Sequence, residues 1–344
     1  TPIHTDYDLI AQRRKFAMGD PMCKGVVLWP EASHVDILEQ FEFIENAWRF
    51  TNKPINSILD RFCKDRYGED AKVYADLWRK TIPISISASN RQGVWRANYA
   101  DMAYTYMCND YSVARPRFYS TYGKNAFTNA PAIFNTLATC SRRTSWHSRD
   151  AADMARTVGD RLVLEASCQA QQAFFRWRDG KATEDEVIAL ADATIKFVDL
   201  MGRVLALHTD FSLNDTLNRT DEIERIRLPN FDKVFLQNAV NHYCMSHQAE
   251  PAVHLYPQMY RIWRDEMVRV IKSGDRAGEM KPKAQGRGLI EKLWEKNLAD
   301  LKPDMVRNDA NWTKTMLDFA DAAAKWLAMP YLTLERYEYP DLGD

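Results

Sequence analysis

The sequence lacks several features that would assign it to a common class of protein. Its 344 residues hold 46 Lys and Arg against 47 Asp and Glu, so no excess charge draws the chain to nucleic acid or to an anionic membrane. No apolar stretch approaches the ~18 residues that a membrane span needs. The composition therefore predicts no nucleic-acid partner and no membrane span.

Short signatures of cofactor and metal sites are also missing. The sequence has no phosphate loop, no glycine-rich dinucleotide fingerprint, no GxSxG nucleophile elbow and no HExxH zinc motif. Its six cysteines include no CxxC pair, which argues against a clustered zinc site but leaves buried thiols and disulfides open. His242 and His247 are five residues apart, a spacing that does not place them on one helix face. We therefore expect no metal and no cofactor.

Helical periodicity dominates the chain after residue 30. In DILEQFEFIENAW (36–48) the apolar residues fall on one face and the acidic residues mostly elsewhere, which predicts an amphipathic helix. Pro54 near a helix start and Gly68 as a C-terminal cap delimit a second helix over about 54–66. Further helices are predicted over 70–81, 94–119, from Pro131, and over 149–178, 183–207 (opened by a Thr183–Glu186 capping box), 231–247, 252–272, 286–301 and 311–328.

Three segments depart from this helical pattern. The run beginning at 25 with GVVLW resembles a buried strand, ISISAS (84–89) alternates like a short strand or an extended linker, and KPKAQGRG (281–288) has the glycines and prolines of a flexible loop. One strand cannot make a sheet. The sequence therefore predicts a mainly α fold whose N-terminal strand either pairs with something that the sequence does not show or is an incidental extended segment.

Glu31 follows the apolar run at its carboxyl end, where barrel folds place catalytic groups. It could equally be a surface carboxylate or lie in the first turn of the next helix, where the helix dipole favours a negative charge. Trp29, beside it, could stack on the apolar face of a sugar, whereas most of the ten tryptophans are expected to pack between long helices. Three sequons, at Asn214, Asn218 and Asn311, would be glycosylation sites in a secretory compartment.

Taken as a unit, the segment 25–49 and RFCKDRYG (61–68) resemble glycoside hydrolase family 89, the α-N-acetylglucosaminidases. Pro30 and Glu31 match the Pro-Glu pair on the last barrel strand of that family. Two helix ends of the family follow in order, one matched by Ala47, Trp48 and Arg49 and one by Arg66, Tyr67 and Gly68.

Looser matches continue along the chain to about residue 222. YADLWRKTI (74–82) resembles a Trp-containing helix of the family, and RDAADMARTVGDRL (149–162) is similar to another helix through Asp153 and Arg156. The segment 199–220 resembles a further family motif through Leu205, Phe211, Leu213 and Leu217. The order and spacing of these motifs carry the resemblance.

The resemblance implies that Glu31 is the nucleophile of a retaining glycosidase whose acid/base glutamate lies in a barrel outside this chain. In such enzymes two carboxyls ~5 to 5.5 Å apart let one attack the anomeric carbon while the other protonates the leaving oxygen. It also implies the end of a catalytic (β/α)₈ barrel over 1–50, with its last strand and helix, and an all-helical C-terminal domain over 51–344. The implied reaction is cleavage of terminal α-linked N-acetylglucosamine from glycans or glycosaminoglycans, in a lysosomal or secreted protein that works with an N-terminal barrel portion or chain.

The sequence also departs from the family pattern. Ala32 stands where the family has Gly, Thr216 stands where it has a pocket-lining Trp, and the loop after Ser87 is shortened. These changes remove groups that would contact a sugar. The alternative is a non-catalytic helical scaffold or glycan-binding protein derived from that domain, and a homo-oligomer is left open.

Overall fold

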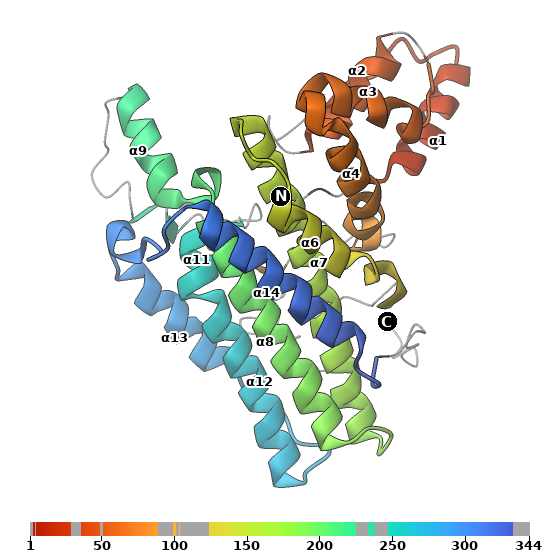
Figure 1. Cartoon of the computed structure of the whole chain (residues 1–344). Helices are drawn as coiled ribbons and strands as arrows, with labels where there is room; N and C mark the ends of the chain where they lie inside the picture. The colour runs from red at the N-terminus through yellow and green to blue at the C-terminus, as the bar shows by residue number, and fades with distance from the viewer. Residues whose placement is uncertain are drawn as a thin grey trace.

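The computed structural model of the chain is built from helices (Figure 1). Every regular element among the residues that it describes is an α-helix or a 3₁₀-helix, which confirms the prediction of a mainly α fold. None of these helices is both long enough and apolar enough to cross a membrane. The described residues are 3, 5–28, 36–48, 51–88, 99–100, 103, 124–224, 233–234, 236–237 and 247–332.

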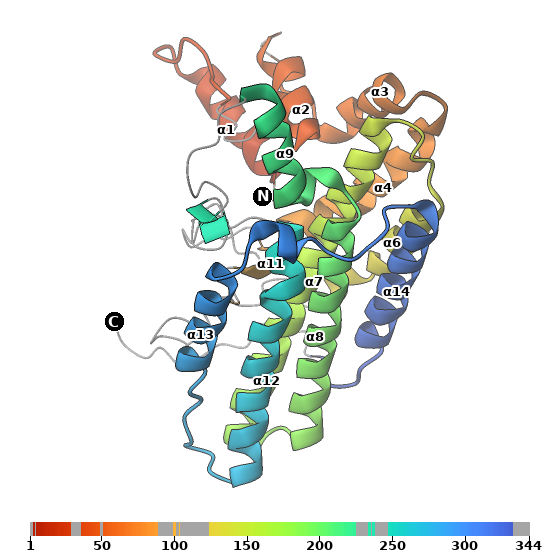
Figure 2. The ribbon, with the colours of Figure 1, turned by 90° about the vertical axis from the view of Figure 1, so that its left-hand side faces the viewer.

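The helices fall into an N-terminal group and a long bundle, as two perpendicular views show (Figures 1 and 2). The N-terminal group consists of α1 (Tyr7–Gly19), α2 (Ile37–Ala47), α3 (Ile55–Tyr67) and α4 (Ala71–Ser85). The bundle consists of α6 (Ala130–Thr139), α7 (Ser145–Arg178), α8 (Glu184–Ala206), α11 (Ala249–His254), α12 (Tyr256–Ser273), α13 (Lys283–Trp294) and α14 (Asp309–Leu327), and α9 (Leu213–Glu224) projects from it.

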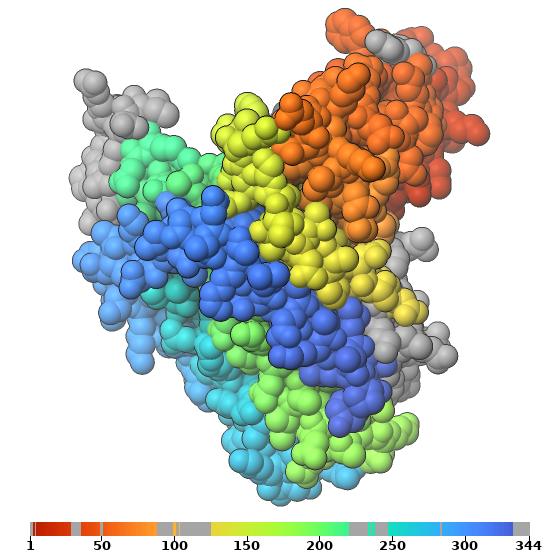
Figure 3. Space-filling model, in the orientation of Figure 1, coloured from red at the N-terminus to blue at the C-terminus, as the bar shows by residue number. Residues whose placement is uncertain are grey.

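Helix α7 is the axis of the molecule. It contacts α8 along the bundle and α4, α6 and α14 on other sides, and its residues from Ala151 to Phe174 are all buried. Helix α14 lies at the surface of the bundle, where it packs on α6 and α8 (Figure 3). Because α7 is buried all round and still carries many charged residues, it differs from an ordinary amphipathic helix, whose charges face water.

Glycine allows unusually close packing at two points of the bundle. A Cβ atom on Gly159 of α7 would lie 2.5 Å from the Met201 sulfur and 3.0 Å from Cζ of Phe319. On α8, a Cβ atom on Gly202 would lie 2.8 Å from the backbone oxygen of Ala252. The backbone of α11 therefore occupies the space that a side chain on residue 202 of α8 would need, and only glycine fits there without a shift.

Most helix boundaries agree with the local signals in the sequence. Gly68 ends α3 with a positive φ of 58°, and Pro131 lies in the first turn of α6. The Thr183 hydroxyl accepts a hydrogen bond of 3.2 Å from the Glu186 amide at the start of α8. The predicted helices over 94–119 and 231–247 lie largely outside the described residues.

Three local predictions were wrong. Helix α4 does not end at Pro83 but runs through it to Ser85, and residues 86–88 form a 3₁₀-helix, η2 (Ile86–Ala88), instead of a strand or linker. Proline costs one backbone hydrogen bond, and the complete burial of Ile84 and Ser85 offsets that cost. The predicted loop at 281–288 contains the first turns of α13, whose Ile290 and Leu293 are buried.

The predicted N-terminal strand has no sheet to join in this part of the chain. Residues 25–28 adopt no regular secondary structure, and the remainder of the run lies outside the described residues. A strand is defined by its partner, and none of the described residues supplies one.

The glycine at 202 gives a test of the bundle geometry. Overpacking of this kind costs about 1–3 kcal/mol, which exceeds the gain of up to about 1 kcal/mol from replacing a helical glycine by alanine. We therefore expect Gly202→Ala to lower the unfolding temperature. Gly288→Ala in α13, where a Cβ atom meets nothing within 4 Å, should leave it unchanged or raise it. Equal behaviour of the two variants in thermal melts would contradict the α8–α11 contact.

Candidate functional site

The predicted nucleophile, Glu31, and the predicted sugar-binding residue, Trp29, lie outside the described residues, as does Pro30. The first described residue after them is Asp36, which caps the N-terminus of α2 in a left-handed conformation with a φ of 51°. Asp36 is 2% exposed, so the chain re-enters the protein interior there. Asp36 is therefore the residue nearest to Glu31 on its carboxyl side whose side-chain contacts are described.

Asp36 is held by the segment that precedes α1. It accepts hydrogen bonds from the Thr5 hydroxyl, from the Tyr7 hydroxyl at 3.2 Å and from the Glu39 amide at 3.2 Å. Thr5 also donates to Glu39 over 3.0 Å, so one hydroxyl contacts two carboxyls. Burial raises the pKa of Asp36 and of Glu39, although the hydrogen bonds from Thr5 oppose the shift.

A second cluster joins α3 and α4 to the start of α7. The guanidinium of Arg66 donates to both oxygens of Asp150, with one bond of 3.0 Å, and the Tyr67 hydroxyl donates to the same carboxyl over 2.7 Å. Tyr67 in turn accepts a bond of 3.1 Å from the Trp78 indole of α4. Asp150 is 3% exposed, so these bonds replace water around a buried charge.

A third cluster lies one turn further along α7. Asp153 pairs with Arg149 at 2.6 Å and with Arg156, and Arg149 also reaches Asp210 at 2.8 Å. The centres of both guanidinium groups lie over the ring of Phe211, at 4.8 and 4.7 Å from its centroid. Burial acts to raise the pKa of Asp153, but Arg156 and Arg149 outweigh it and hold the pKa below its ordinary value.

These clusters bring together segments that are far apart in the sequence and that all carry the resemblance described above. Arg66 and Tyr67 come from the Arg-Tyr-Gly helix end, Trp78 from the Trp-containing helix, and Phe211 from η4 (Thr209–Phe211). Arg66 and Tyr67 contact α7 at Asp150, and Phe211 contacts it at Arg149 and Arg156. Trp78 is linked to α7 through the Tyr67 hydroxyl. Asp36 is close enough to Asp153 for the two charges to interact, so the segment that follows Glu31 also approaches this stretch.

A fourth cluster, deeper in the bundle, is organised by Asp160 and Arg161. Asp160 pairs with Arg161, lies 3.1 Å from His247 and accepts a bond of 2.9 Å from the Tyr99 amide. Arg161 donates to the carbonyl of Ser85 over 3.0 Å and to that of Ile3 over 3.4 Å. The amide of Ile3 donates to Thr157 over 3.0 Å, which ties the N-terminal segment to α7.

The three predicted glycosylation sites differ in their surroundings. Asn218 is exposed, whereas the Asn214 amide donates to Glu250 and to the Leu298 carbonyl, both over 2.9 Å. Glu250 also accepts from the Leu213 amide and so closes the N-terminal turn of α9. The Asn311 amide donates to the Val306 carbonyl over 2.7 Å. A glycan on Asn214 or Asn311 would replace one amide hydrogen of a group already used in folding.

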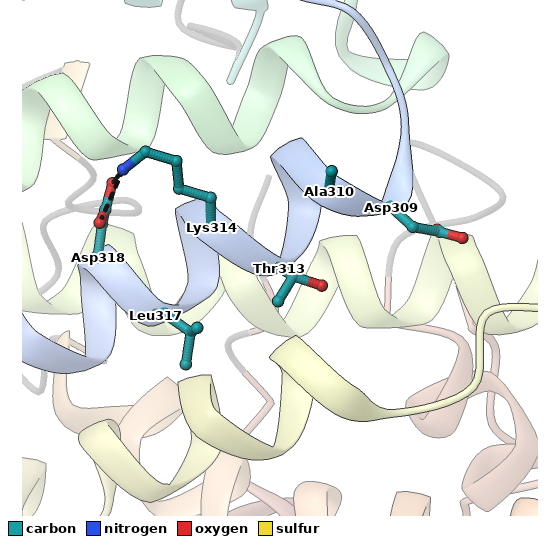
Figure 4. Close-up of a pocket in the computed structure, with 6 residues that line it drawn as sticks. All are labelled: Asp309, Ala310, Thr313, Lys314, Leu317 and Asp318. Carbon is teal, nitrogen blue, oxygen red and sulfur yellow. Dashed lines mark hydrogen bonds and ion pairs between the residues drawn. The ribbon is translucent and has the colours of Figure 1, made fainter.

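The described surface includes two hollows. An open hollow on α14 lies along one helix face, where Lys314 pairs with Asp318 at 2.9 Å (Figure 4). A smaller hollow of about 50 Å³ lies between α1, α2 and the segment that joins them. No group of three His, Cys, Asp or Glu side chains within the described ranges could hold a metal ion. Four of the six cysteines are free thiols, namely Cys23, Cys63, Cys140 and Cys168.

The charged groups along α7 are therefore suited to positioning rather than to chemistry. The carboxylates of Asp150, Asp153 and Asp160 are each paired or hydrogen bonded, so none is poised to attack a substrate. The sequence analysis singled out Asp153 and Arg156 but missed Asp160 and Arg161. Part of the signal was present, because the charged residues 149, 153, 156 and 160 share one face of the helix, although Arg161 lies on a different face.

Neither a scan against models of known protein families nor a search of curated proteins finds a match to this chain. The resemblance to family 89 rests on the quoted motifs and their order along the sequence.

The buried ion pair of Asp160 and Arg161 predicts that a single substitution will strongly lower the free energy of unfolding. Asp160→Asn keeps the shape of the side chain but leaves the buried guanidinium of Arg161 without its counter-charge, which costs about 3–5 kcal/mol. We expect a clear loss of unfolding free energy in urea titrations. Asp76→Asn, which breaks an exposed ion pair with Lys80 on α4, should change it by less than about 0.5 kcal/mol. A loss as small as that of the control would mean that Asp160 and Arg161 are not buried together.

The buried His247 and the partly buried His208 predict that stability falls on acidification. Burial lowers the pKa of His208 to about 4 and that of His247 to about 4, although Asp210 and Asp160 respectively oppose the shift. The unfolded chain takes up these protons near pH 6.5 and the folded chain does not, so stability is complete above about pH 6.5 and is lost towards pH 4. Each histidine should cost about 2 kcal/mol at pH 5. Melts of the parent and of His208→Asn between pH 7.5 and 5 test this, and an identical pH slope in both would contradict it.

Proposed function

We propose that this chain is the helical portion of a retaining glycoside hydrolase of the α-N-acetylglucosaminidase type, with Glu31 as its nucleophile. It would act together with a barrel that supplies the acid/base glutamate. The substrate would be terminal α-linked N-acetylglucosamine on glycans or glycosaminoglycans, in a lysosomal or secreted setting.

The convergence of the motifs on α7 is the observation that supports this proposal best. Chance similarities would have no reason to pack against one another, whereas motifs of a common fold are expected to do so. Arg66, Tyr67 and Phe211 contact the same two turns of α7 from separate parts of the chain, and Trp78 is linked to them through Tyr67. Their partner on α7 is the stretch that contains Asp153 and Arg156, which the resemblance had selected independently.

In the proposed reaction the helical portion positions the segment that carries Glu31. Asp36 is anchored by Thr5 and Tyr7, and Ile3 is anchored on α7, so the chain on the carboxyl side of Glu31 is fixed to the bundle. The Glu31 carboxylate would attack the anomeric carbon while the acid/base glutamate protonates the leaving oxygen. Water, deprotonated by the same acid/base group, would then release the sugar with retained configuration.

A non-catalytic scaffold or glycan-binding protein derived from this domain is the second candidate. The side chain at the position of the family's pocket-lining Trp favours it. The Thr216 hydroxyl donates to the Ser212 carbonyl of its own helix over 2.9 Å and accepts from Arg219, so this side chain contributes to α9 and offers no ring to a sugar.

Replacement of Glu31 separates the two candidates. In the protein assayed with its barrel, on an aryl α-N-acetylglucosaminide, Glu31→Gln should abolish turnover without changing the unfolding temperature. Glu31→Ala should be rescued by azide, with a glycosyl azide of inverted configuration as product, because azide then takes the place of the missing nucleophile. Glu295→Gln is the matched control, because Glu295 is exposed and lies far from these motifs along the sequence. Full turnover by Glu31→Gln would end the assignment of the nucleophile.

A further inference from the structure

Thr5 joins two carboxyls that have no cation beside them. Its hydroxyl lies within hydrogen-bond distance of Asp36 and, at 3.0 Å, of Glu39. Thr5 and Asp36 are buried, and Glu39 is partly buried in the first turn of α2. Neither carboxyl forms an ion pair with a Lys, Arg or His side chain of the described chain. Two neighbouring acids without a counter-charge are uncommon inside a protein, since ionised groups there are normally paired.

The titratable groups of α1 and α2 do not supply the missing charge. Arg14 is the nearest cation on α1, and it pairs with Glu42 at 2.7 Å instead. Tyr7 donates to Asp36 over 3.2 Å, and burial together with the charges of Asp36, Glu39 and Glu42 raises its pKa. Tyr7 therefore acts as a neutral hydrogen-bond donor.

Helix α7 adds a further negative charge to these surroundings. Asp153 is the charged group of α7 that acts on Asp36, and it raises the pKa of that carboxyl. The nearby arginines, Arg149 and Arg156, are both paired with Asp153. The pair of Asp36 and Glu39 therefore faces acids and hydroxyls on every element that packs against it.

The hydrogen bonds at Thr5 require a proton on one of the two carboxyls. A hydroxyl has one hydrogen, so Thr5 donates to only one carboxyl at a time. If both carboxyls were ionised, the other contact would bring a hydroxyl lone pair against a carboxylate, which is repulsive. With one carboxyl protonated, that acid donates to the Thr5 oxygen while Thr5 donates to the other acid. The arrangement is therefore that of two acids that share one proton.

The donors around the pair favour Glu39 as the protonated group. Asp36 accepts from Thr5, from Tyr7 and from the Glu39 amide, and donors of this kind stabilise the ionised form. The Glu39 carboxyl is bonded by Thr5 alone among the described residues. Burial and the charges of Asp36 and Glu42 raise the pKa of Glu39. The positive end of the α2 dipole acts in the opposite direction, but Asp36 already caps it.

We propose that Asp36, Thr5 and Glu39 form a pH-sensitive latch between the N-terminal segment and α2, closed while Glu39 is protonated and weakened when Glu39 ionises. The latch holds Asp36 at a φ of 51°, which is the one positive φ among the described residues other than glycine. A left-handed conformation of this kind persists where contacts enforce it. The amide of Ile3 is bonded to Thr157 of α7, so the latch ties α2 to a segment that is itself fixed on the bundle.

The latch has a definite pH dependence. The folded chain keeps the Glu39 proton to a higher pH than the unfolded chain, because its pKa is raised in the folded state. The contribution to stability is therefore complete below about pH 4.3 and is lost as the pH rises through the folded pKa. The buried histidines act in the opposite sense, so the latch has to be measured as a difference between variants.

Glu39→Gln tests the latch in thermal melts of the 344-residue chain. Glutamine has the shape of the neutral acid, and its amide donates to Thr5 at any pH. We expect its unfolding temperature, relative to the parent, to rise by about 2–4 °C between pH 5 and pH 8. Glu291→Gln, at an exposed position of α13, is the control and should show no such rise. A difference between Glu39→Gln and the parent that does not grow with pH would overturn the proposal.

Hydrogen exchange locates the effect on α2. Relative to the intrinsic rates and to the amides of α14, exchange of the α2 amides of the parent should rise by about tenfold between pH 5 and pH 8. Glu39→Gln should abolish the rise. Thr5→Val, which removes the hydroxyl, should give fast exchange at both pH values, whereas Thr5→Ser should behave as the parent does. A rise that persists in Glu39→Gln, or slow exchange in Thr5→Val, would overturn the latch.

The latch and the proposed glycosidase can fail separately. Asp36 follows Glu31 by five residues, but the melts and the exchange need neither a barrel nor a substrate. Azide rescue at position 31 together with a pH-independent Glu39→Gln difference would refute the latch and leave the nucleophile standing. A pH-dependent difference without azide rescue would do the reverse.

Discussion

The structure depends on the need to neutralise charges that α7 carries into the interior. Asp160 and Arg161 are 0% and 3% exposed, and an isolated charge in such a place costs several kcal/mol. Their mutual ion pair leaves further donors and acceptors to be satisfied, and these come from Ile3, Ser85 and Tyr99. Ile3, the end of α4 and Tyr99 are therefore fixed on the bundle by electrostatics as well as by apolar burial.

The same constraint recurs towards the start of α7 and explains how the N-terminal helices are oriented. Asp150 is hydrogen bonded by Arg66 and Tyr67 of α3, and Trp78 of α4 donates in turn to Tyr67. Asp153 pairs with two arginines, Arg149 and Arg156, which also lie over the Phe211 ring of η4. Because every one of these charges has a specific partner, the clusters specify one arrangement of the surrounding elements. They also leave no free carboxylate among themselves, so any chemistry has to come from groups that this frame positions.

Local signals in the sequence were sufficient for most helices and insufficient for the interior. A cap at Thr183, a glycine at 68 and a proline at 131 act within a few residues, and each predicted its helix boundary. Pro83 misled because the burial of Ile84 is a tertiary effect that outweighs the local preference. The partners of Asp160 and Arg161 could not be predicted from periodicity, since Ile3 is 158 residues away from Arg161 along the chain. For the candidate site, the sequence indicated Asp153, Arg156 and Phe211 but not that Arg156 lies over the Phe211 ring.

Helix α2 was predicted at the right place in the sequence, but the prediction of which of its residues are buried was partly wrong. The periodicity placed Ile37, Leu38, Phe41, Ile44 and Trp48 together in the core, yet only the first three pack against it, while Glu42, Glu45 and Asn46 are buried instead. Arg14 and Arg61 compensate the two buried glutamates, with N–O distances of 2.7 and 2.9 Å. Helix α2 therefore buries its charges against α1 and α3 and exposes Ile44 and Trp48. Periodicity identifies an apolar face, but which face is buried also depends on charge partners on other helices, such as Arg14 on α1 and Arg61 on α3.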